Sequence, residues 1–341
     1  MTERTYDVAV VGATGAVGEV LLELLVERGF PVGRLVPLAS ARSAGEEVAF
    51  GKKTLRVQVL DEFDFAGIDF AFFSAGGSVS AVHAPRAAAA GAVVIDNTSH
   101  FRMDPEVPLV VPEVNADALA PFDDPAHSGI IANPNCSTIQ MVVALAPIHR
   151  EVGIARINVA TYQAVSGAGR KAMEELGRQT ADKLNFRDPT VEAFSAPIAF
   201  NVIPLIDVLD DQGFTREERK MHNETRRILD DRSLGVNATA VRVPVFYGHA
   251  EAVHFETREP IELERVRELL ASAPGVELLG PDAAPTPLEH ASGRDAVVVG
   301  RLRRDPTHVC GIDLWIVADN LRKGAALNAI QVAETVLERR G

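Results

Sequence analysis

Cysteine is scarce in this sequence, with two residues of this type, Cys136 and Cys310, among 341. Two cysteines so far apart provide neither a disulfide framework nor a cysteine-rich metal site. Long apolar runs are lacking too, because none approaches the roughly 18 residues of a membrane-spanning helix. The zinc-binding pattern His-Glu-x-x-His is also absent. We therefore expect neither a resident metal nor a membrane partner.

Positive charge is outweighed: 34 lysines and arginines face 47 aspartates and glutamates, for a formal net charge of −13. This balance argues against nucleic acid as a partner. It does not exclude a small anionic substrate, because a few arginines in a pocket can override the overall field. The length indicates two domains, and 47% hydrophobic residues indicate a soluble globular protein. A first strand predicted from Tyr6 leaves no room for a signal peptide, so we expect a cytoplasmic protein.

A glycine-rich turn follows the first predicted strand, Tyr6–Val11. Gly12, Gly15 and Gly18 have the spacing Gly-x-x-Gly-x-x-Gly rather than the commoner Gly-x-Gly-x-x-Gly, and an amphipathic helix is predicted over residues 19–28. Strand, glycine turn and helix in this order are typical of a dinucleotide-binding unit. The glycines let the backbone approach a pyrophosphate at the helix N-terminus. A glycine turn can also serve plain packing, but this position in the chain favours cofactor binding.

The segment after the second predicted strand, residues 35–38, favours NADP over NAD. An NAD site usually has an Asp or Glu there to bind the ribose hydroxyls. This chain has Ser40, Arg42 and Ser43 instead, and a guanidinium with two hydroxyls suits a 2′-phosphate. The alternative is that Arg42 is merely solvated in a loop.

Strands and helices continue to alternate up to residue 132. Further strands are predicted at 55–60, 68–73, 92–95, 107–111 and 130–131, and a helix at 79–90. This alternation predicts a doubly wound parallel sheet, in which ligands gather at the carboxyl ends of the strands. Arg102 follows one of these strands and is a candidate anion ligand. The alternative for Arg102 is an ordinary surface ion pair.

Cys136 belongs to the segment Asn133–Thr138, around which we expect the chemistry to be organised. Pro134 biases the residue before it away from helical angles, and Asn135 can then cap a helix that has Cys136 in its first turn. The free N–H groups and the dipole at a helix start favour a thiolate, which is a strong nucleophile. The alternative is a buried structural cysteine. Cys310, predicted inside a strand at 309–317, has no such cap and is interpreted as core packing.

Polar residues of the second half are candidates for holding a substrate. Gln163 follows a strand predicted at 157–162 and carries both a donor and an acceptor for an acyl group. The predicted helix that begins after Thr215 has a capping box with Glu218. Glu217 and Lys220 share one face of this helix, and their spacing alone favours a solvated ion pair.

Arg242 and His249 form the third key stretch. Arg242 lies between apolar residues, as an inward charge on a strand would, and a buried arginine needs an anionic partner such as a substrate carboxylate. His249 follows a glycine at a predicted bend, and histidine is the natural acid or base near neutral pH. His254 lies an odd number of residues away, so an unbroken strand would point the two rings to opposite faces. This argues against a metal pair, and we interpret His254 as structural.

Five segments, in order along the whole chain, resemble the aspartate-semialdehyde dehydrogenase family. They are Gly-Ala-Thr-Gly-Ala-Val-Gly at 12–18, Asn-Pro-Asn-Cys-Ser-Thr at 133–138, Gln-Ala-Val-Ser-Gly at 163–167, Arg-Val-Pro-Val at 242–245 with His249, and Asp-Asn-Leu-Arg-Lys-Gly at 319–324. The resemblance implies reversible, NADPH-dependent reduction of L-aspartyl 4-phosphate to aspartate semialdehyde and inorganic phosphate by a homodimer. This step feeds lysine (through diaminopimelate), threonine and methionine synthesis.

The resemblance also implies roles for individual residues. Cys136 becomes the acylated nucleophile, and His249 becomes the proton acceptor. The substrate is held by Gln163 and Arg242, by Glu217 through its amino group, and by Arg102 and Lys220 through its phosphate. Taken with the glycine and Ser-Ala-Arg-Ser segments, the residues predicted to bind NADP are Gly12, Thr14, Gly15, Ala16, Val17, Ser40, Ala41, Arg42, Ser43, Ser166, Gly167 and Asn320.

The implied architecture is an N-terminal doubly wound (Rossmann) domain, a second α+β catalytic and dimerisation domain, and a C-terminal helix at 327–339 that returns to the first. The predicted ranges are 1–132 with 321–341, and 133–320. Two alternatives stay open. One is a reductase of another acyl phosphate, such as N-acetylglutamyl phosphate, although an acetylated nitrogen needs no anionic partner like Glu217. The other is a non-catalytic NADP-binding protein, which would tolerate Cys136→Ser.

Overall fold

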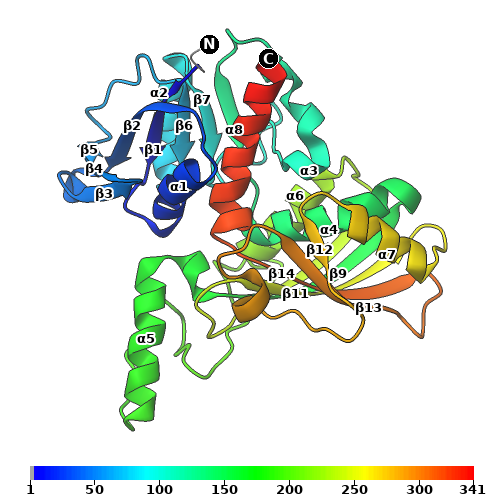
Figure 1. Cartoon of the computed structure of the whole chain (residues 1–341). Helices are drawn as coiled ribbons and strands as arrows, with labels where there is room; N and C mark the ends of the chain where they lie inside the picture. Colours follow the sequence, from blue (N-terminus) through cyan, green and yellow to red (C-terminus); the bar gives the residue numbers. More distant parts are fainter. Residues whose placement is uncertain (1–3) are drawn as a thin grey trace. The chain divides into compact units, whose positions relative to one another are not determined.

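The computed structural model describes residues 4–341, which divide into two compact units (Figure 1). The first consists of the described residues up to Pro134 together with Ala325–Gly341, and the second of Asn135–Gly324. The predicted domain ranges given above stay a prediction.

The first unit is built on a parallel sheet. In spatial order its strands are β5 (Gln58–Val59), β2 (Val32–Ala39), β1 (Tyr6–Val11), β6 (Phe70–Phe73), β7 (Val93–Asp96) and β8 (Gly129–Ala132). The chain winds outward from β1 in both directions, so the order reverses between β1 and β6. Such a reversal is the point at which doubly wound sheets bind their ligands.

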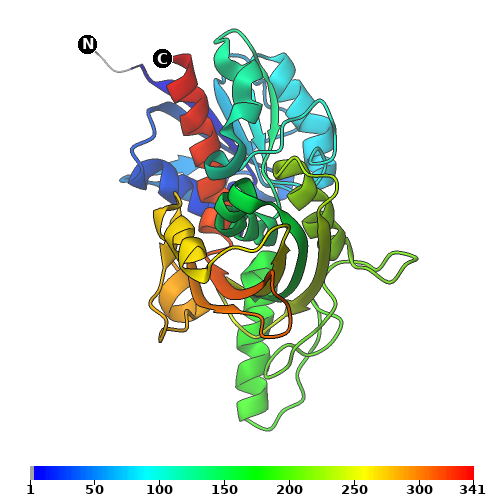
Figure 2. The same cartoon turned by 90° about the vertical axis from the view of Figure 1, so that its right-hand side faces the viewer.

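Helices cover both faces of this sheet, as both views show (Figures 1 and 2). Leucines of α1 (Ala16–Glu27) and apolar residues of α8 (Leu327–Arg340) pack on one face. Alanines of α2 (Gly77–Ala89) pack on the other. The strands are buried on both sides, which explains their continuous apolar sequences. The predicted fold class is confirmed, including the return of the C-terminal helix to the first unit.

Two predicted strands of this unit are wrong in detail. Residues 107–111 form a single bridge, from Leu109 to Ala132, before α3 (Pro112–Asn115) begins. Pro108 has no N–H to donate, and the N–H of Val111 donates to the Asn115 side chain, so the ladder stops there.

The segment predicted as one strand at 55–60 divides in two. β4 (Lys53–Arg56) forms an antiparallel hairpin with β3 (Glu47–Phe50), and only β5 joins the parallel sheet. Val57, between β4 and β5, pairs with residues Gly45 and Glu46 at the base of the hairpin.

The second unit contains a mixed sheet. Its strands are, in spatial order, β10 (Gly235–Arg242), β9 (Ile154–Gln163), β11 (His249–Thr257), β14 (Gly311–Ala318), β13 (Val297–Arg304) and β12 (Val276–Leu278). Its α-helices are α4 (Cys136–Val152), α5 (Arg170–Leu184), α6 (Arg216–Ile228) and α7 (Leu263–Ser272). Helices α4, α6 and α7 contact the sheet, whereas α5 extends away from it (Figures 1 and 2).

Alternation along the strands separates a covered face from an open one. In β11, His249, Glu251, Val253 and the other odd-numbered residues are buried, and the even-numbered residues from Ala252 onward are half-buried. Cys310 lies just before β14 rather than inside it and is half-buried, so its predicted place in a strand is wrong. The chain still turns there, because the N–H of Gly311 donates to His308.

Candidate active site

Cys136 is the first residue of α4, as predicted. Asn135 has extended backbone angles, and its side-chain oxygen accepts hydrogen bonds from the N–H groups of Ser137 and Thr138 at 3.1 and 3.2 Å. Cys136 is half-buried, whereas the residues that follow it are almost all fully buried. No acidic residue lies in the first helical turn, so the helix dipole there favours a thiolate.

Gly324 packs directly against Cys136. A Cβ built at Gly324 would lie 2.8 Å from the Cβ of Cys136, closer than side-chain atoms approach each other. In the same segment, Asn320 links two neighbouring parts of the unit: its Oδ1 accepts from the N–H of Gly248 at 3.0 Å, and its Nδ2 donates to Ser166 at 3.0 Å. A glycine at 324 is therefore a steric requirement for the position of Cys136.

His249 is fully buried, and one hydrogen bond determines which ring nitrogen carries the proton. The N–H of Ala164 donates to Nδ1 at 3.0 Å, so the proton of the neutral ring belongs on Nε2. Among the described residues, Nε2 has no hydrogen-bond partner. Burial, and then the charge of Arg242, lower the pKa of His249 to about 3, against the opposing effect of Glu217. His249 is thus a neutral donor near pH 7.

Arg242 ends β10 and is 6% exposed, which agrees with the predicted inward charge. Its Nη1 donates to the carbonyl of Ala164 at 2.7 Å. Burial lowers the pKa of Arg242, while Glu217 and Cys136 raise it. A Cβ built at Gly167 would lie 3.0 Å from Nη1 of Arg242 and 3.3 Å from Nε2 of His249. Any side chain at position 167 would therefore crowd both of these groups.

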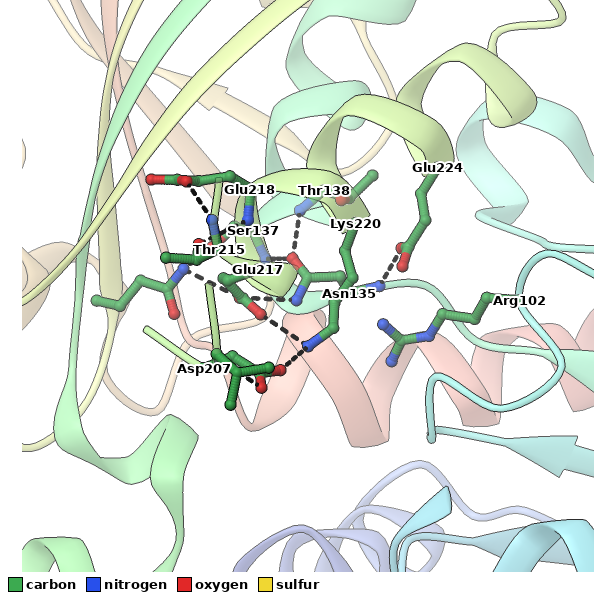
Figure 3. Close-up of polar contacts among 12 residues, drawn as sticks. Arg102, Asn135, Ser137, Thr138, Asp207, Thr215, Glu217, Glu218, Lys220 and Glu224 are labelled. Atoms are coloured by element: carbon green, nitrogen blue, oxygen red, sulfur yellow. Dashed lines mark hydrogen bonds and ion pairs between the residues drawn. The ribbon is translucent and has the colours of Figure 1, made fainter. Parts of the chain in front are cut away.

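Glu217 is the centre of a polar cluster at the start of α4 (Figure 3). Its Oε1 accepts hydrogen bonds from Asn135 at 2.8 Å and Gln163 at 3.1 Å, and its Oε2 pairs with Lys220 at 3.0 Å. Burial raises the pKa of Glu217, but Lys220 and the hydrogen bonds from Asn135 and Gln163 lower it to about 2. Glu217 is therefore an ionised carboxylate. The ion pair suggested by the spacing exists, but Glu217 is 5% exposed rather than solvated.

Glu224, which the sequence patterns above did not single out, supports the same cluster. Its Oε2 accepts a hydrogen bond from the N–H of Asn135 at 2.6 Å. The predicted capping box of Thr215 and Glu218 is confirmed, and it fixes the residue at which α6 begins. Glu217 and Glu224 are seven residues apart, so they share a helix face. That spacing was a signal in the sequence for both buried carboxylates.

A cavity of about 390 Å³ in the first unit is lined by six of the twelve predicted cofactor residues. Its lining is Gly12, Thr14, Gly15, Ala39, Ser40, Arg42, Ser43, Leu60, Asp61, Ser74, Ala75, Val79 and His83. Such a volume suits a small ligand or part of a cofactor. Gly12 has φ +87°, and a Cβ there would lie 3.0 Å from the backbone of Ser74. At the glycine loop and the start of α1 a ligand can therefore approach the backbone closely, which fits the pyrophosphate of a dinucleotide.

The remaining predicted cofactor residues lie near this cavity or in the other unit. Ala16 and Val17 begin α1, and Ala41 begins a short 3₁₀ helix with Arg42 and Ser43. Ser166 and Asn320 are bonded to each other in the second unit, where Gly167 also lies. Asp61 and His83 also line the cavity and were not predicted from the sequence.

Arg102 and His254 have different surroundings from each other. Arg102, in the first unit, is 7% exposed and its Nη2 donates to the carbonyl of Asn97 at 2.7 Å, so it is not a surface side chain. His254 pairs with Asp313 of β14 at 2.9 Å on the open face of the sheet.

Within residues 4–341, no group of three or more His, Cys, Asp and Glu side chains is arranged to hold a metal. The same residues include no helix of the length and apolarity needed to cross a membrane.

Comparisons with known proteins cover almost the whole chain. Residues 7–121 match the family model described as semialdehyde dehydrogenase, NAD binding domain, so the first unit takes a nicotinamide cofactor. Residues 145–323 match semialdehyde dehydrogenase, dimerisation domain.

Individual relatives agree with the family models. The chain is 57% identical over 334 residues to aspartate-semialdehyde dehydrogenase 2 of Vibrio cholerae, covering 98% of each. It is 56% identical over 339 residues to the Legionella pneumophila aspartate-semialdehyde dehydrogenase, covering 98% of this chain and 96% of that one. A crystal structure of the V. cholerae enzyme II complexed with ASA superposes with a TM-score of 0.95 at 56% identity, covering 98% of this chain and 99% of that one. The chain belongs to the aspartate-semialdehyde dehydrogenase family.

Proposed function

We propose that this chain catalyses the reversible, NADPH-dependent reductive dephosphorylation of L-aspartyl 4-phosphate to L-aspartate 4-semialdehyde and inorganic phosphate. The product would enter lysine, threonine and methionine synthesis. The observation that carries the proposal is the placement of Cys136 at a capped helix start, in the electrostatic range of the buried Arg242. A thiolate there can form a thioester with the substrate acyl group.

The residues of the chain account for the steps around the thioester. The Cys136 thiolate attacks the acyl carbon, a tetrahedral oxyanion forms, and its collapse expels phosphate. When bound, NADPH supplies the hydride that brings the thioester to the aldehyde level. The resulting thiohemiacetal oxyanion releases the aldehyde and the thiolate. Neither collapse requires a net proton transfer, and a hydrogen bond from Nε2 of His249 would stabilise negative charge at both stages.

Proton acceptance by His249 stays a prediction with a structural condition. The Nδ1 atom already accepts the N–H of Ala164, so the ring could take up a second proton only if that hydrogen bond broke. The low pKa of His249, caused by burial and Arg242, disfavours the same event.

The polar cluster supports aspartate as the substrate skeleton. The ionised Glu217 would bind the amino group, Arg242 and Gln163 the carboxylate and acyl group, and Arg102 with Lys220 the phosphate. An N-acetylated substrate has no cationic nitrogen for Glu217, so N-acetylglutamyl phosphate is the weaker alternative. Comparing turnover of aspartate semialdehyde with that of N-acetylglutamate semialdehyde separates the two.

The direct test is reduction of NADP by purified protein with aspartate semialdehyde, with and without inorganic phosphate. The proposal requires a rate that depends on phosphate. Binding of NADPH without turnover of either aldehyde would support the non-catalytic alternative. In the same assay, competition between NADP and NAD tests the proposed preference, which rests on Ser40, Arg42 and Ser43 in the cavity wall.

A homodimer is the proposed assembly. The match of residues 145–323 to a dimerisation domain supports it. The open face of the mixed sheet provides a surface, because a hollow of about 780 Å³ there is lined by residues from β9, β10, β11 and β14.

A further inference from the structure

The cavity of the first unit contains a pair of side chains that no step above uses. Asp61 lies just beyond the end of β5, and His83 lies in α2; both line the cavity. Nε2 of His83 is 3.2 Å from Oδ1 of Asp61. The imidazole is 9% exposed and the carboxylate 74%, so the histidine is fixed in the wall and the aspartate faces the open side.

The contacts of His83 determine which of its ring nitrogens donates and which accepts a hydrogen bond. Nη1 of Arg86 lies 2.7 Å from Nδ1 of His83, and a guanidinium can only donate, so Nδ1 accepts. The proton of the neutral ring is then on Nε2, which donates to Asp61. Burial and Arg86 lower the pKa of His83, against the effect of Asp61, so the ring stays neutral near pH 7. Arg86 is itself held by the carbonyl of Phe63 at 3.1 Å.

Asp61 therefore faces the cavity as an oriented acceptor. One carboxylate oxygen accepts the hydrogen bond from Nε2 of His83, and a carboxylate has further acceptor sites. A negative group would repel a phosphate, so this part of the cavity suits a neutral donor. The neighbouring lining residues Leu60, Ala75 and Val79 are apolar and suit the faces of a planar ring.

The glycine loop and Arg42 occupy other parts of the same lining. Because they account for the pyrophosphate and the 2′-phosphate, the group left for Asp61 is the base. We propose that Asp61, positioned by His83, accepts a hydrogen bond from the 6-amino group of adenine and so selects adenine over bases with a 6-carbonyl. This inference rests on the proposed use of NADPH.

The test compares two dinucleotides that differ at this one position. NADPH and its reduced hypoxanthine analogue, in which a carbonyl replaces the amino group, are titrated against the protein, and each Kd is measured by nucleotide fluorescence. The wild type should bind NADPH about tenfold more tightly, as expected for one hydrogen bond to a charged group. In Asp61→Ala this ratio should fall to near one, and in Asp61→Asn it should fall as far or invert, since an amide can donate to a carbonyl.

Glu62→Gln is the matched control, because it removes the same charge at the adjacent exposed residue, which does not line the cavity. Loss of charge affects both dinucleotides equally and cancels in the ratio. His83→Phe should lower the ratio part of the way by releasing Asp61, and His83→Gln, which restores a donor, should recover it. Retention of the fold is checked by circular dichroism, and the exposure of Asp61 makes its substitution tolerable.

The outcomes separate this inference from the proposed function. If the wild type binds neither dinucleotide, the cofactor proposal fails. If NADPH binds but the wild type shows no preference for adenine, or Asp61→Ala keeps the full preference, the assignment of Asp61 is overturned while the cofactor proposal stands.

Discussion

At the scale of single residues, charge states set the chemistry of the site. Glu217 is ionised because Lys220 and two amide donors outweigh its burial, and His249 is neutral because burial and Arg242 disfavour its protonated form. With pKa values of about 2 and about 3, neither group changes charge between pH 5 and 8. These two groups near Cys136 therefore keep the same charge over that range.

Replacing Cys136, the proposed nucleophile, should separate catalysis from cofactor binding. Cys136→Ser puts a hydroxyl that does not ionise at neutral pH at the start of α4, so turnover should fall by at least about a thousandfold. The Kd for NADPH should stay nearly the same, because Cys136 is not among the residues predicted to bind the cofactor and serine keeps the size of the side chain. Steady-state kinetics and a fluorescence titration measure the two. Cys310→Ser, before β14, is the control and should keep full activity; substantial turnover by Cys136→Ser would contradict the mechanism.

His249 should also make stability depend on pH. Its pKa is depressed from 6.5 to about 3 by folding, so the unfolded chain binds the extra proton first as pH falls. This contribution is complete above pH 6.5 and is lost as pH falls toward 3, by at most roughly 5 kcal/mol. Glu251, whose pKa burial raises well above 4.5, has the opposite sign, because its contribution is lost as pH rises.

A comparison of variants isolates the histidine. The free energy of unfolding in urea is measured between pH 7 and 5 for the wild type and for His249→Gln. The wild type should lose more stability on acidification than the variant, since glutamine has no proton to gain. Equal slopes for the wild type and His249→Gln would mean that the ring is protonated as easily in the folded state.

At the scale of secondary structure, the start of α4 depends on the segment that crosses it. Gly324→Ala would place a Cβ 2.8 Å from that of Cys136, so the helix start or the segment must move. We expect activity to fall by more than about tenfold and stability by roughly 1–3 kcal/mol. Gly177→Ala, in α5 where a Cβ meets nothing within 4 Å, should keep activity and not lose stability. Unchanged kinetics in Gly324→Ala would show that the approach of this segment is not required.

Local sequence patterns predicted most helices and strands. Features that depend on contacts between distant residues could not be predicted in this way. The Asn135 cap and the Thr215 capping box were readable because each involves residues a few positions apart. The strand predicted at 107–111 failed because apolar content was weighed above the missing N–H of Pro108. The burial of Glu217 could not be predicted, because its partners Asn135 and Gln163 come from 82 and 54 residues away.

At the scale of the whole molecule, the sequence predicted two domains, one to bind the dinucleotide and one for catalysis and dimerisation. Alternating strands and helices implied the parallel sheet, and the glycine turn indicated its ligand edge. The pair of Asp61 and His83 was beyond such reasoning, because the residues are 22 positions apart and meet only when β5 and α2 are assembled. Ordered motifs identified the family, since five short segments in sequence are far more specific than any one of them.

The proposed dimer follows from the face of the second unit that its own helices leave open. Tyr162 and Trp315 lie on this face as a ring pair with centroids 5.3 Å apart, and aromatic residues are enriched in interfaces. In a twofold dimer each substitution occurs twice, so Ala252→Glu, in the lining of the hollow, would bury two unpaired charges. Sedimentation velocity should give about 73 kDa for the wild type, twice the chain mass of 36.6 kDa, and a monomer for the variant. Val82→Glu, at an exposed position of α2, should remain dimeric. A monomeric wild type at micromolar concentration, or a dimeric Ala252→Glu, would place the interface elsewhere or remove it.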